Sequence, residues 1–206
     1  MDIFLHGFAT TPAIWPAGGP VLHFDDLERE AERVGQGLGR GTRVIGWSMG
    51  GMVALLVAAR YPEKVGQLVL VSTTPKFIAS ADFSGGLPLA LLRRLEKRIK
   101  TEGIKAFHAL VFPDGHNAGL ADLTVEQALK ELAALEKVDL RSLLGSIKAP
   151  TLIVHGERDE ICRPAAASYL HAGIAGSELV ILPGVKHAPP VEAPERFAEL
   201  LRNNAG

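Results

Sequence analysis

Residues 46–51, Gly46-Trp47-Ser48-Met49-Gly50-Gly51, decide the fold. This G-x-S-x-G motif stands between a strand-like run at residues 42–45 and a helix-like run at residues 52–60. A serine on so sharp a strand-to-helix turn is a nucleophile elbow, whose hydroxyl projects from the end of a sheet. Such a turn requires small residues two positions before and two after the serine, and glycine occupies both positions. The alternative interpretation is a glycine-rich turn with an incidental serine.

The length and composition indicate a globular protein. The chain has 206 residues, enough to bury a sizeable core as one domain with room for an inserted subdomain. A hydrophobic content of 47% and a charged content of 22% are ordinary for such proteins. The net charge of −1 creates no overall field toward nucleic acid or a membrane, so neither is an expected partner.

The cysteine content and the lack of a long apolar run bear on the compartment of the protein, and the pattern of possible metal ligands bears on its cofactors. A single cysteine, Cys162, excludes an intramolecular disulfide and fits a reducing compartment. Residues 1–8 lack the basic start and cleavage site of a signal peptide, and no apolar run reaches the roughly 18 residues of a membrane span. We therefore expect a cytoplasmic protein that exists as a monomer or weak dimer. No cluster of metal ligands stands out in the sequence, so we expect neither a metal nor an organic cofactor.

Short apolar strands alternate with helical patterns along most of the chain. The predicted strands are residues 3–5, 21–24, 43–46, 67–72, 151–155 and 178–182, and the predicted helices are residues 26–38, 49–61, 164–172 and 194–203. This alternation predicts an α/β fold with a doubly wound, mostly parallel sheet.

Residues 76–146 break the alternation. No convincing strand occurs there, and three helices are predicted at residues 87–101, 103–112 and 124–138, the last with a capping box at Thr124 and Gln127. We therefore expect a core formed by residues 1–75 and 147–206, with a helical cap at residues 76–146 that shields a pocket.

Other segments supply what an activated serine needs. His6-Gly7-Phe8 follows the first predicted strand, where a loop of this kind provides one backbone N–H of an oxyanion hole. The residue after the serine provides the other, so the predicted donors are Phe8 and Met49. Such a donor stabilises the charge that develops on the carbonyl oxygen by about 3–4 kcal/mol.

An acid and a base follow in the order that an elbow serine requires. Asp159 lies just after the strand at residues 151–155, where it can orient a base, with Glu157 and Glu160 as alternatives. His187 follows the last predicted strand and can accept the serine proton. Among the other six histidines, His6 and His155 are expected to orient backbone near the site, and His23, His108, His116 and His171 to lie at the surface or in packing.

These motifs resemble those of the α/β-hydrolase superfamily over nearly the whole chain. The matching segments are HGF at residues 6–8, GWSMGG at 46–51, GERDEICRP at 156–164 and GVKHAPPVEAPERF at 184–197. A full superfamily core has two strands before the HG strand, whereas that strand begins here at Ile3. We therefore expect a core trimmed at the N-terminus to about six strands, with the catalytic residues intact.

Within the superfamily, the chain resembles the pimeloyl-[acyl-carrier protein] methyl ester carboxylesterases of biotin synthesis. The similar pieces are residues 46–48, VDLRSLL at 138–144 and KHAP at 186–189. The resemblance implies a catalytic triad of Ser48, Asp159 and His187, with Phe8 and Met49 at the oxyanion positions. It also implies that Trp47, together with Phe8, lines the channel for the acyl chain. The alternative for Trp47 is an aromatic packed under the cap.

The cap carries an uneven charge. Between Leu87 and Ala106, six Lys and Arg face two Glu, a net +4, so the rest of the chain carries −5. At about 100° per residue one arc of the first cap helix is basic and the opposite arc is apolar. We expect this arc to dock an acidic acyl carrier protein, although a solvated helix face or a membrane surface are alternatives. The candidate docking residues are Arg93, Arg94, Lys97, Arg98 and Lys100.

The sequence therefore predicts a serine carboxylesterase acting on an acyl ester, with pimeloyl-[acyl-carrier protein] methyl ester as the first candidate substrate. Two rivals stay open. One is a generalist carboxylesterase, thioesterase or lactonase on small acyl substrates, and the other is a ligand-binding relative without turnover. The intact triad argues against the second rival.

Overall fold

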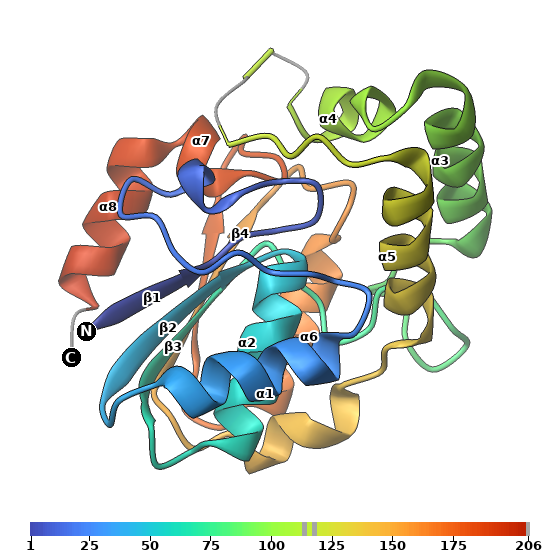
Figure 1. Cartoon of the computed structure of the whole chain (residues 1–206). Coiled ribbons are helices and arrows are strands. Elements are labelled where there is room, and N and C mark those ends of the chain that lie inside the picture. The colour runs from blue at the N-terminus through green and yellow to red at the C-terminus, as the bar shows by residue number, and fades with distance from the viewer. Residues whose placement is uncertain (113–114, 117–118, 205–206) are drawn as a thin grey trace.

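A computed structural model describes residues 1–112, 115–116 and 119–204. Five parallel strands form one sheet in the order β1-β2-β3-β4-β5 (Figure 1). Their bounds are β1 (Asp2–Leu5), β2 (Thr42–Trp47), β3 (Val65–Val71), β4 (Thr151–Gly156) and β5 (Glu178–Leu182). The predicted α/β fold with a parallel sheet is confirmed.

Helices cover both faces of this sheet. On one face lie α1 (Leu27–Gly37), α2 (Met49–Arg60) and α6 (Pro164–Gly173), and on the other lie α7 (Pro189–Glu192) and α8 (Pro194–Asn203) (Figure 1). Parallel strands joined in sequence order by right-handed crossovers place their connecting helices on one side, which accounts for α1, α2 and α6.

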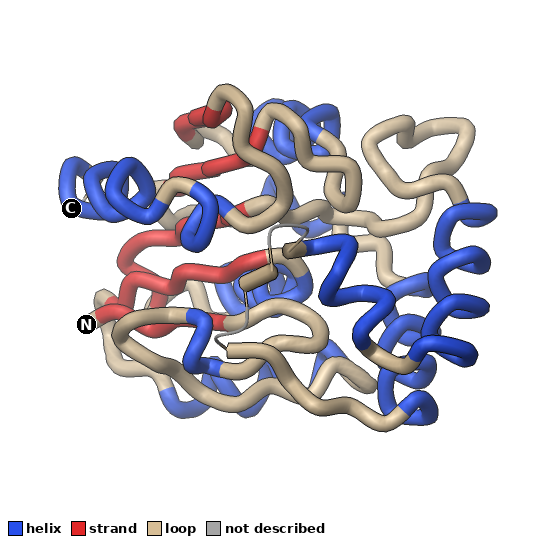
Figure 2. The backbone as a smooth tube through the Cα atoms, turned by 90° about the horizontal axis from the view of Figure 1, so that it is seen from above, coloured by secondary structure: helices blue, strands red, loops and turns tan. Residues whose placement is uncertain are grey.

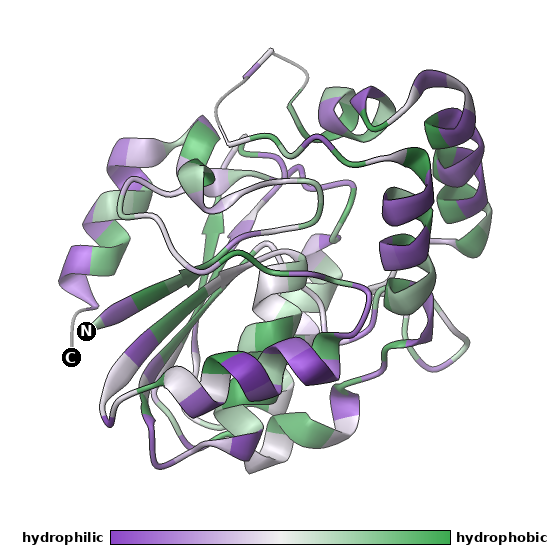
Figure 3. Ribbon diagram, viewed as in Figure 1, coloured by the Kyte–Doolittle hydropathy of each residue, from purple (hydrophilic) through white to green (hydrophobic). Residues whose placement is uncertain are grey.

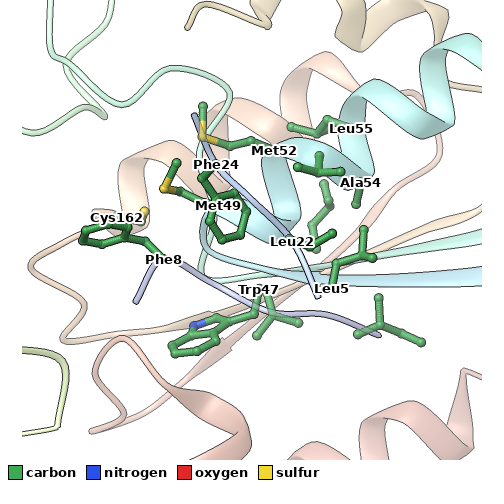
Figure 4. Packing of buried hydrophobic residues seen from close by; sticks show 14 of the residues in the cluster. Leu5, Phe8, Leu22, Phe24, Trp47, Met49, Met52, Ala54, Leu55 and Cys162 are labelled. Carbon is green, nitrogen blue, oxygen red and sulfur yellow. The ribbon is translucent and has the colours of Figure 1, made fainter. Parts of the chain in front are cut away.

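The side chains of β2 show how the two faces divide. Gly46 abuts α2, because a Cβ added there would lie 2.8 Å from Cβ of Ala54. The neighbouring Trp47 points the other way, as the period of two in a strand requires. Figure 4 shows Trp47 on the opposite side of the sheet from Ala54 and Leu55 of α2.

The predicted strand at residues 21–24 is wrong, and the sheet has five strands instead of about six. Leu22 and Phe24 are buried while Val21 is 58% exposed, which gives the alternation that a strand shows. The segment is instead an irregular loop beside β1, where the Leu22 N–H donates to Nε2 of His6. The alternating burial of residues 21–24 was therefore predicted correctly. The backbone of the segment, however, bonds to the His6 side chain instead of to a neighbouring strand.

Three helices lie between β3 and β4, as predicted: α3 (Leu89–Glu102), α4 (Lys105–Val111) and α5 (Val125–Lys137). They lie beyond the carboxyl ends of the strands, where α3 packs against α4 and α5 (Figure 2). The predicted capping box of Thr124 and Gln127 is confirmed at the start of α5. Two 3-10 helices, η1 (Pro12–Ile14) and η2 (Arg141–Ser146), were not predicted. The division into a core and a cap domain remains an interpretation of this arrangement.

Hydropathy follows the layers of the fold. The strands are largely hydrophobic, while hydrophilic and hydrophobic residues alternate along α1 and α3, as helices with one buried face require (Figure 3). In the described part of the chain, no helix is long and apolar enough to cross a membrane. The same residues contain no group of three or more His, Cys, Asp or Glu placed to hold a metal ion.

Candidate active site

Ser48 occupies a strained turn between β2 and α2. Its φ of 55° and ψ of −121° lie in a region that side-chain-bearing residues rarely adopt, at a cost of about 1–3 kcal/mol. Glycines make the turn possible, because a Cβ at Gly46 would lie 2.5 Å from the Gly50 carbonyl oxygen. A Cβ at Gly50 would lie 2.4 Å from the carbonyl oxygen of Leu5 in β1. The requirement for small residues on both sides of the serine is confirmed.

Two contacts from the end of β3 hold this turn in place. The Ser48 N–H donates to the Val71 carbonyl oxygen at 3.0 Å. The Thr73 hydroxyl donates to the Ser48 carbonyl oxygen at 2.7 Å, and Thr73 is buried. Thr73 was not singled out from the sequence, although its signal is visible: a run of three hydroxyl residues, 72–74, directly follows a buried apolar strand.

Ser48, His187 and Asp159 form a continuous hydrogen-bonded chain. Nε2 of His187 lies 3.0 Å from the Ser48 hydroxyl, and Nδ1 lies 2.8 Å from Oδ2 of Asp159. Because a carboxylate only accepts, Nδ1 carries the proton and Nε2 is free to accept the serine proton. The three residues are 9%, 2% and 3% exposed respectively, so solvent competes little for these hydrogen bonds. The structure therefore brings together the three predicted residues.

The Asp159 carboxylate is surrounded by donors. Oδ1 accepts the N–H groups of Ile161 and Cys162, each at 2.9 Å, and Nε2 of His155 lies 3.3 Å from Oδ2. Burial by itself raises the pKa of Asp159, but the charge of His187 and the hydrogen bonds from His155 and His187 outweigh it. The pKa of this carboxyl is thereby held well below its ordinary value, and the group stays ionised beside the imidazole.

The two alternative acids lie elsewhere. Oε2 of Glu157 accepts the Gly184 N–H at 2.9 Å, which joins the loop after β4 to the loop after β5. Glu160 lines the pocket described below. Among the described residues, neither glutamate bonds to His187, so the geometry favours Asp159.

His6 and His155 bond to the backbone near the site, as the sequence predicts. His6 lies with Nδ1 3.0 Å from the Gly7 carbonyl oxygen and accepts a backbone N–H at Nε2. Burial lowers the pKa of His6, which favours the neutral ring that this arrangement requires. Nε2 of His155 lies 2.5 Å from the Cys162 carbonyl oxygen, while its Nδ1 is buried without a partner in the described chain.

The predicted oxyanion donors face the same cavity as the nucleophile. Phe8 and Met49 both line the pocket beside Ser48, and Figure 4 shows their side chains close together. Neither backbone N–H donates to any residue that the structure describes. The Met49 N–H is also the first of α2, so the partial positive charge of that helix N-terminus points to the same place. Both N–H groups are thus available to an anionic oxygen.

A pocket of about 610 Å³ opens over Ser48. Aromatic and aliphatic side chains from the sheet edge and from α3, α4 and α5 form most of its wall. The lining residues away from the triad include Phe77, Leu87, Leu95, Phe107, Leu132 and Leu135. A pocket of this size and character suits a small acyl chain rather than a polar sugar or a nucleotide.

Trp47 is not among the residues that line this pocket, and its implied role in the acyl channel stays a prediction. Its ring is buried against Phe112, with centroids 6.1 Å apart, as in the alternative of a packed aromatic. Its Nε1–H donates to the His187 carbonyl oxygen at 2.8 Å. The direction of the ring follows from strand geometry, because the residue before the nucleophile faces away from the α2 side of the sheet. Trp47 therefore holds the loop that carries the base.

The candidate docking residues divide into two groups. Arg93 forms ion pairs with Glu96 and Glu136, and Arg98 pairs with Glu102, all at 2.8 Å. Their charges are already matched on the surface of the helices.

The other three, Arg94, Lys97 and Lys100, are exposed and form no ion pair with any described residue. Arg94 and Arg98 also line the pocket, together with Arg163. Unpaired positive charge thus lies along α3, and Arg94 brings part of it to the edge of the cavity.

Comparisons with known proteins identify the family of this chain. The model of the alpha/beta hydrolase family matches residues 16–200. A pimeloyl-[acyl-carrier protein] methyl ester esterase of Neisseria meningitidis serogroup A is 35% identical over 214 residues, covering 93% of this chain and 69% of the relative. The esterase of the same name from Nitrosospira multiformis is 31% identical over 212 residues, covering 96% of this chain and 80% of the relative.

Solved structures share the fold at lower identity. An esterase from Exiguobacterium antarcticum has a TM-score of 0.83 at 21% identity, covering 98% of this chain and 90% of that one. An enol-lactonase from Burkholderia xenovorans has a TM-score of 0.79 at 19% identity, covering 98% and 89%. The family match spans most of the sequence, and the architecture is the same. The chain belongs to the alpha/beta hydrolase family.

Proposed function

We propose that this chain is a serine carboxylesterase, with Ser48 as nucleophile, His187 as general base and acid, and Asp159 as the group that orients His187. One observation carries the proposal: the buried contacts of 3.0 Å and 2.8 Å that join the three side chains at the floor of an apolar pocket. A ligand-binding relative without turnover has no need of so complete a relay.

The first half of the reaction follows from this geometry. His187 Nε2 takes the proton as the Ser48 oxygen attacks the ester carbonyl, and the carbonyl oxygen becomes an anion. The N–H groups of Phe8 and Met49 stabilise that anion. They bind it more strongly than the carbonyl oxygen of the bound ester, because the anion carries more negative charge. His187 then returns the proton to the departing alkoxide, so an alcohol leaves and an ester to Ser48 remains.

The second half repeats the steps with water. His187 accepts a proton from a water molecule as its oxygen attacks the acyl-enzyme carbonyl, and the proton passes to the Ser48 oxygen as the acid leaves. The ionised Asp159 stabilises the transient imidazolium in both halves. All the groups required are side chains and backbone N–H groups of this chain, and the proposed mechanism uses no metal or cofactor.

We propose the methyl ester of pimeloyl-[acyl-carrier protein] as the substrate. Relatives above 30% identity carry that name, and the apolar pocket suits an aliphatic acyl chain. The exposed cations of α3 at the pocket edge provide attraction for an acidic carrier outside the pocket. We also propose that the reaction takes place in the cytoplasm, in line with the single cysteine of the chain.

The direct test compares two methyl esters. Purified enzyme is assayed on pimeloyl-[acyl-carrier protein] methyl ester and on the monomethyl ester of free pimelate, with release of methanol as the measurement. We expect kcat/KM at least tenfold higher for the carrier-linked ester. Equal values would favour the generalist esterase. Rescue of a biotin-requiring strain that lacks its own esterase provides an independent test in cells.

The carrier contact is tested by charge reversal on α3. Lys97→Glu with Lys100→Glu should lower kcat/KM for the carrier-linked ester about tenfold at low salt and less at high salt, because exposed charges are screened and neither residue lines the pocket. Neither residue is ion-paired within the described chain, so the change breaks no internal bridge. Hydrolysis of p-nitrophenyl butyrate should stay close to wild type.

The matched control reverses the same number of charges on α8. Arg196 and Arg202 are exposed on that helix, which lies on the far side of the sheet from α3 (Figure 1). Arg196→Glu with Arg202→Glu should leave both activities unchanged. Equal losses from the two double variants would mean that net charge matters and that α3 is not the docking surface.

A further inference from the structure

The cap helix α4 reaches the loop that carries the oxyanion donor Phe8. Nε2 of His108 in α4 lies 2.9 Å from the Ala9 carbonyl oxygen, and because a carbonyl only accepts, Nε2 carries the proton and donates. The Ala121 N–H donates to the same oxygen at 3.0 Å. Both donors come from the stretch between β3 and β4, whereas Ala9 follows β1.

Further contacts join the same two segments. The Phe8 ring meets Phe107 of α4 edge to face, with centroids 4.7 Å apart. The Thr11 N–H donates to the Gly119 carbonyl oxygen at 2.7 Å, and Thr10 pairs with Leu120 as an isolated antiparallel bridge. The loop after β1 is therefore attached to the cap over several consecutive residues.

The backbone of this loop needs such support. Ala9 has a φ of 55°, in the left-handed region that residues with a Cβ rarely adopt. The N–H of Phe8 belongs to the Gly7–Phe8 peptide, whose carbonyl oxygen accepts the backbone N–H and the hydroxyl of Thr10 at 3.3 Å and 2.8 Å. Relaxation of Ala9 would move Thr10 and thereby tilt the peptide that carries the N–H of Phe8. A hydrogen bond weakens steeply as its donor turns away from the acceptor, so a small rotation would weaken the bond to an oxyanion.

We infer that His108 is a positioning residue of the oxyanion hole, holding the Ala9 carbonyl so that the Phe8 N–H points at the developing anion. The inference rests on the proposed esterase function and extends it, since it makes a cap side chain part of the catalytic geometry. It also gives His108 a role beyond the surface or packing place that the sequence predicts.

The test uses two variants of similar shape. His108→Gln keeps an N–H donor and His108→Met removes it, while neither adds charge. For His108→Met we expect kcat on p-nitrophenyl butyrate to fall about tenfold with KM changed less than twofold, a fraction of the loss on removing a whole oxyanion donor. His108→Gln should recover most of the rate. His171→Leu is the matched control, because His171 on α6 also makes a side-chain hydrogen bond, with Ser177 at 3.0 Å.

A transition-state analogue separates positioning from packing. The hemiketal that a trifluoromethyl ketone forms with the serine places an anionic oxygen in the oxyanion hole, so its Ki should rise in His108→Met by the same factor as kcat falls. Rates are normalised to the active sites titrated with a fluorophosphonate, so partial unfolding does not enter the comparison. An unchanged Ki and kcat in His108→Met would overturn the inference. A rise in KM alone would also overturn it, because it would assign His108 to substrate binding. Failure of the esterase proposal itself looks different: wild type would not react with the fluorophosphonate.

Discussion

The end of the sheet that carries Ser48 and the outer surface of α3 are held by different forces. Ser48, Asp159 and His187 are almost fully buried, and each is fixed by hydrogen bonds to neighbours from other loops. On α3, by contrast, the side chains of Arg94 and Lys97 are exposed and form no ion pair with a described residue. The function of the first region depends on short distances between particular atoms, and that of the second depends on its net positive charge.

This difference predicts a division of labour. A proton relay works only when donor and acceptor stay within about 3 Å, which requires dense packing and low exposure. Attraction of a large partner works over roughly a Debye length and tolerates mobile side chains. Changes at the buried site should therefore alter kcat on every ester, whereas changes on α3 should alter only reactions that involve a charged partner.

The strongest challenge to this division is Ser48→Ala. We expect esterase activity to fall by at least about 10⁴-fold, because the nucleophile is lost while the oxyanion donors remain. The measurement is the rate on p-nitrophenyl butyrate, with labelling by a fluorophosphonate as a second readout. A Ser48→Ala protein that keeps a tenth of the wild-type rate would place the nucleophile elsewhere.

Glu131 of α5 tests how this helix is attached to the residues around Phe24. Its side chain is buried, with 9% of the residue exposed. Burial raises the pKa of Glu131 to about 7, although a hydrogen bond with the Phe24 backbone acts in the opposite direction. The unfolded chain releases this proton near pH 4.5, so the folded state holds more protons between pH 4.5 and about 7. Stability is therefore lost as pH rises through that window, by roughly 2–3 kcal/mol above pH 7.

Glu131→Gln removes the ionisation that causes this loss. We expect the variant to be more stable than wild type by roughly 2–3 kcal/mol at pH 8 and nearly equal at pH 4.5, as measured by urea unfolding at each pH. Glu126→Gln, at an exposed position of the same helix, should show no such pH dependence. A stability difference that is the same at both pH values would contradict the protonation argument.

Trp47 and Trp15 provide a matched pair for the role of the base loop. Both are 2% exposed, but Trp47 donates to the His187 carbonyl oxygen, while Nε1 of Trp15 has no partner in the described residues. Trp47→Phe should lower kcat about tenfold, because the loop that carries His187 loses an anchoring hydrogen bond. Trp15→Phe should leave kcat unchanged. If both variants lose the same fraction of activity, the effect comes from packing.

Chelation should have the smallest effect of all. The described residues contain no cluster fit to hold a metal ion, and the proposed relay needs none. Dialysis against EDTA should therefore leave the rate on p-nitrophenyl butyrate within experimental error. Loss of activity that added metal restores would contradict the serine mechanism.

Much of the fold could be predicted from local patterns. The predicted strand at residues 178–182 and the predicted helix at residues 194–203 match β5 and α8 at both ends. These elements have strong periodicity or a proline at the start, which are properties of neighbouring residues. The strand predicted at residues 21–24 was wrong because the burial pattern of this segment is that of a strand. In the described residues, only the absence of a neighbouring strand distinguishes the segment from a true strand.

The candidate site divides in the same way. The glycines around Ser48 and the order of serine, acid and histidine are local signals, so the sequence selected the residues that the structure brings together. The direction of Trp47 depends on which face of the sheet is covered by α2, and local sequence does not contain that information. The contact of Thr73 could not be predicted in the same way, because its partner is the backbone carbonyl of Ser48 and no side-chain motif marks it.

The sequence by itself determined the kind of chemistry, because a strained serine turn needs particular small residues at fixed offsets. The sequence favoured Asp159 as the acid, but only the tertiary structure set aside Glu157 and Glu160, since the three lie within four positions and differ in direction. The tertiary structure also decided which cations of α3 stay unpaired, because Arg93 finds Glu136 on another helix, 43 positions away. The physical reason is range: strain and periodicity act between neighbours along the chain, whereas hydrogen bonds and ion pairs depend on which distant segments the fold brings within about 3 Å.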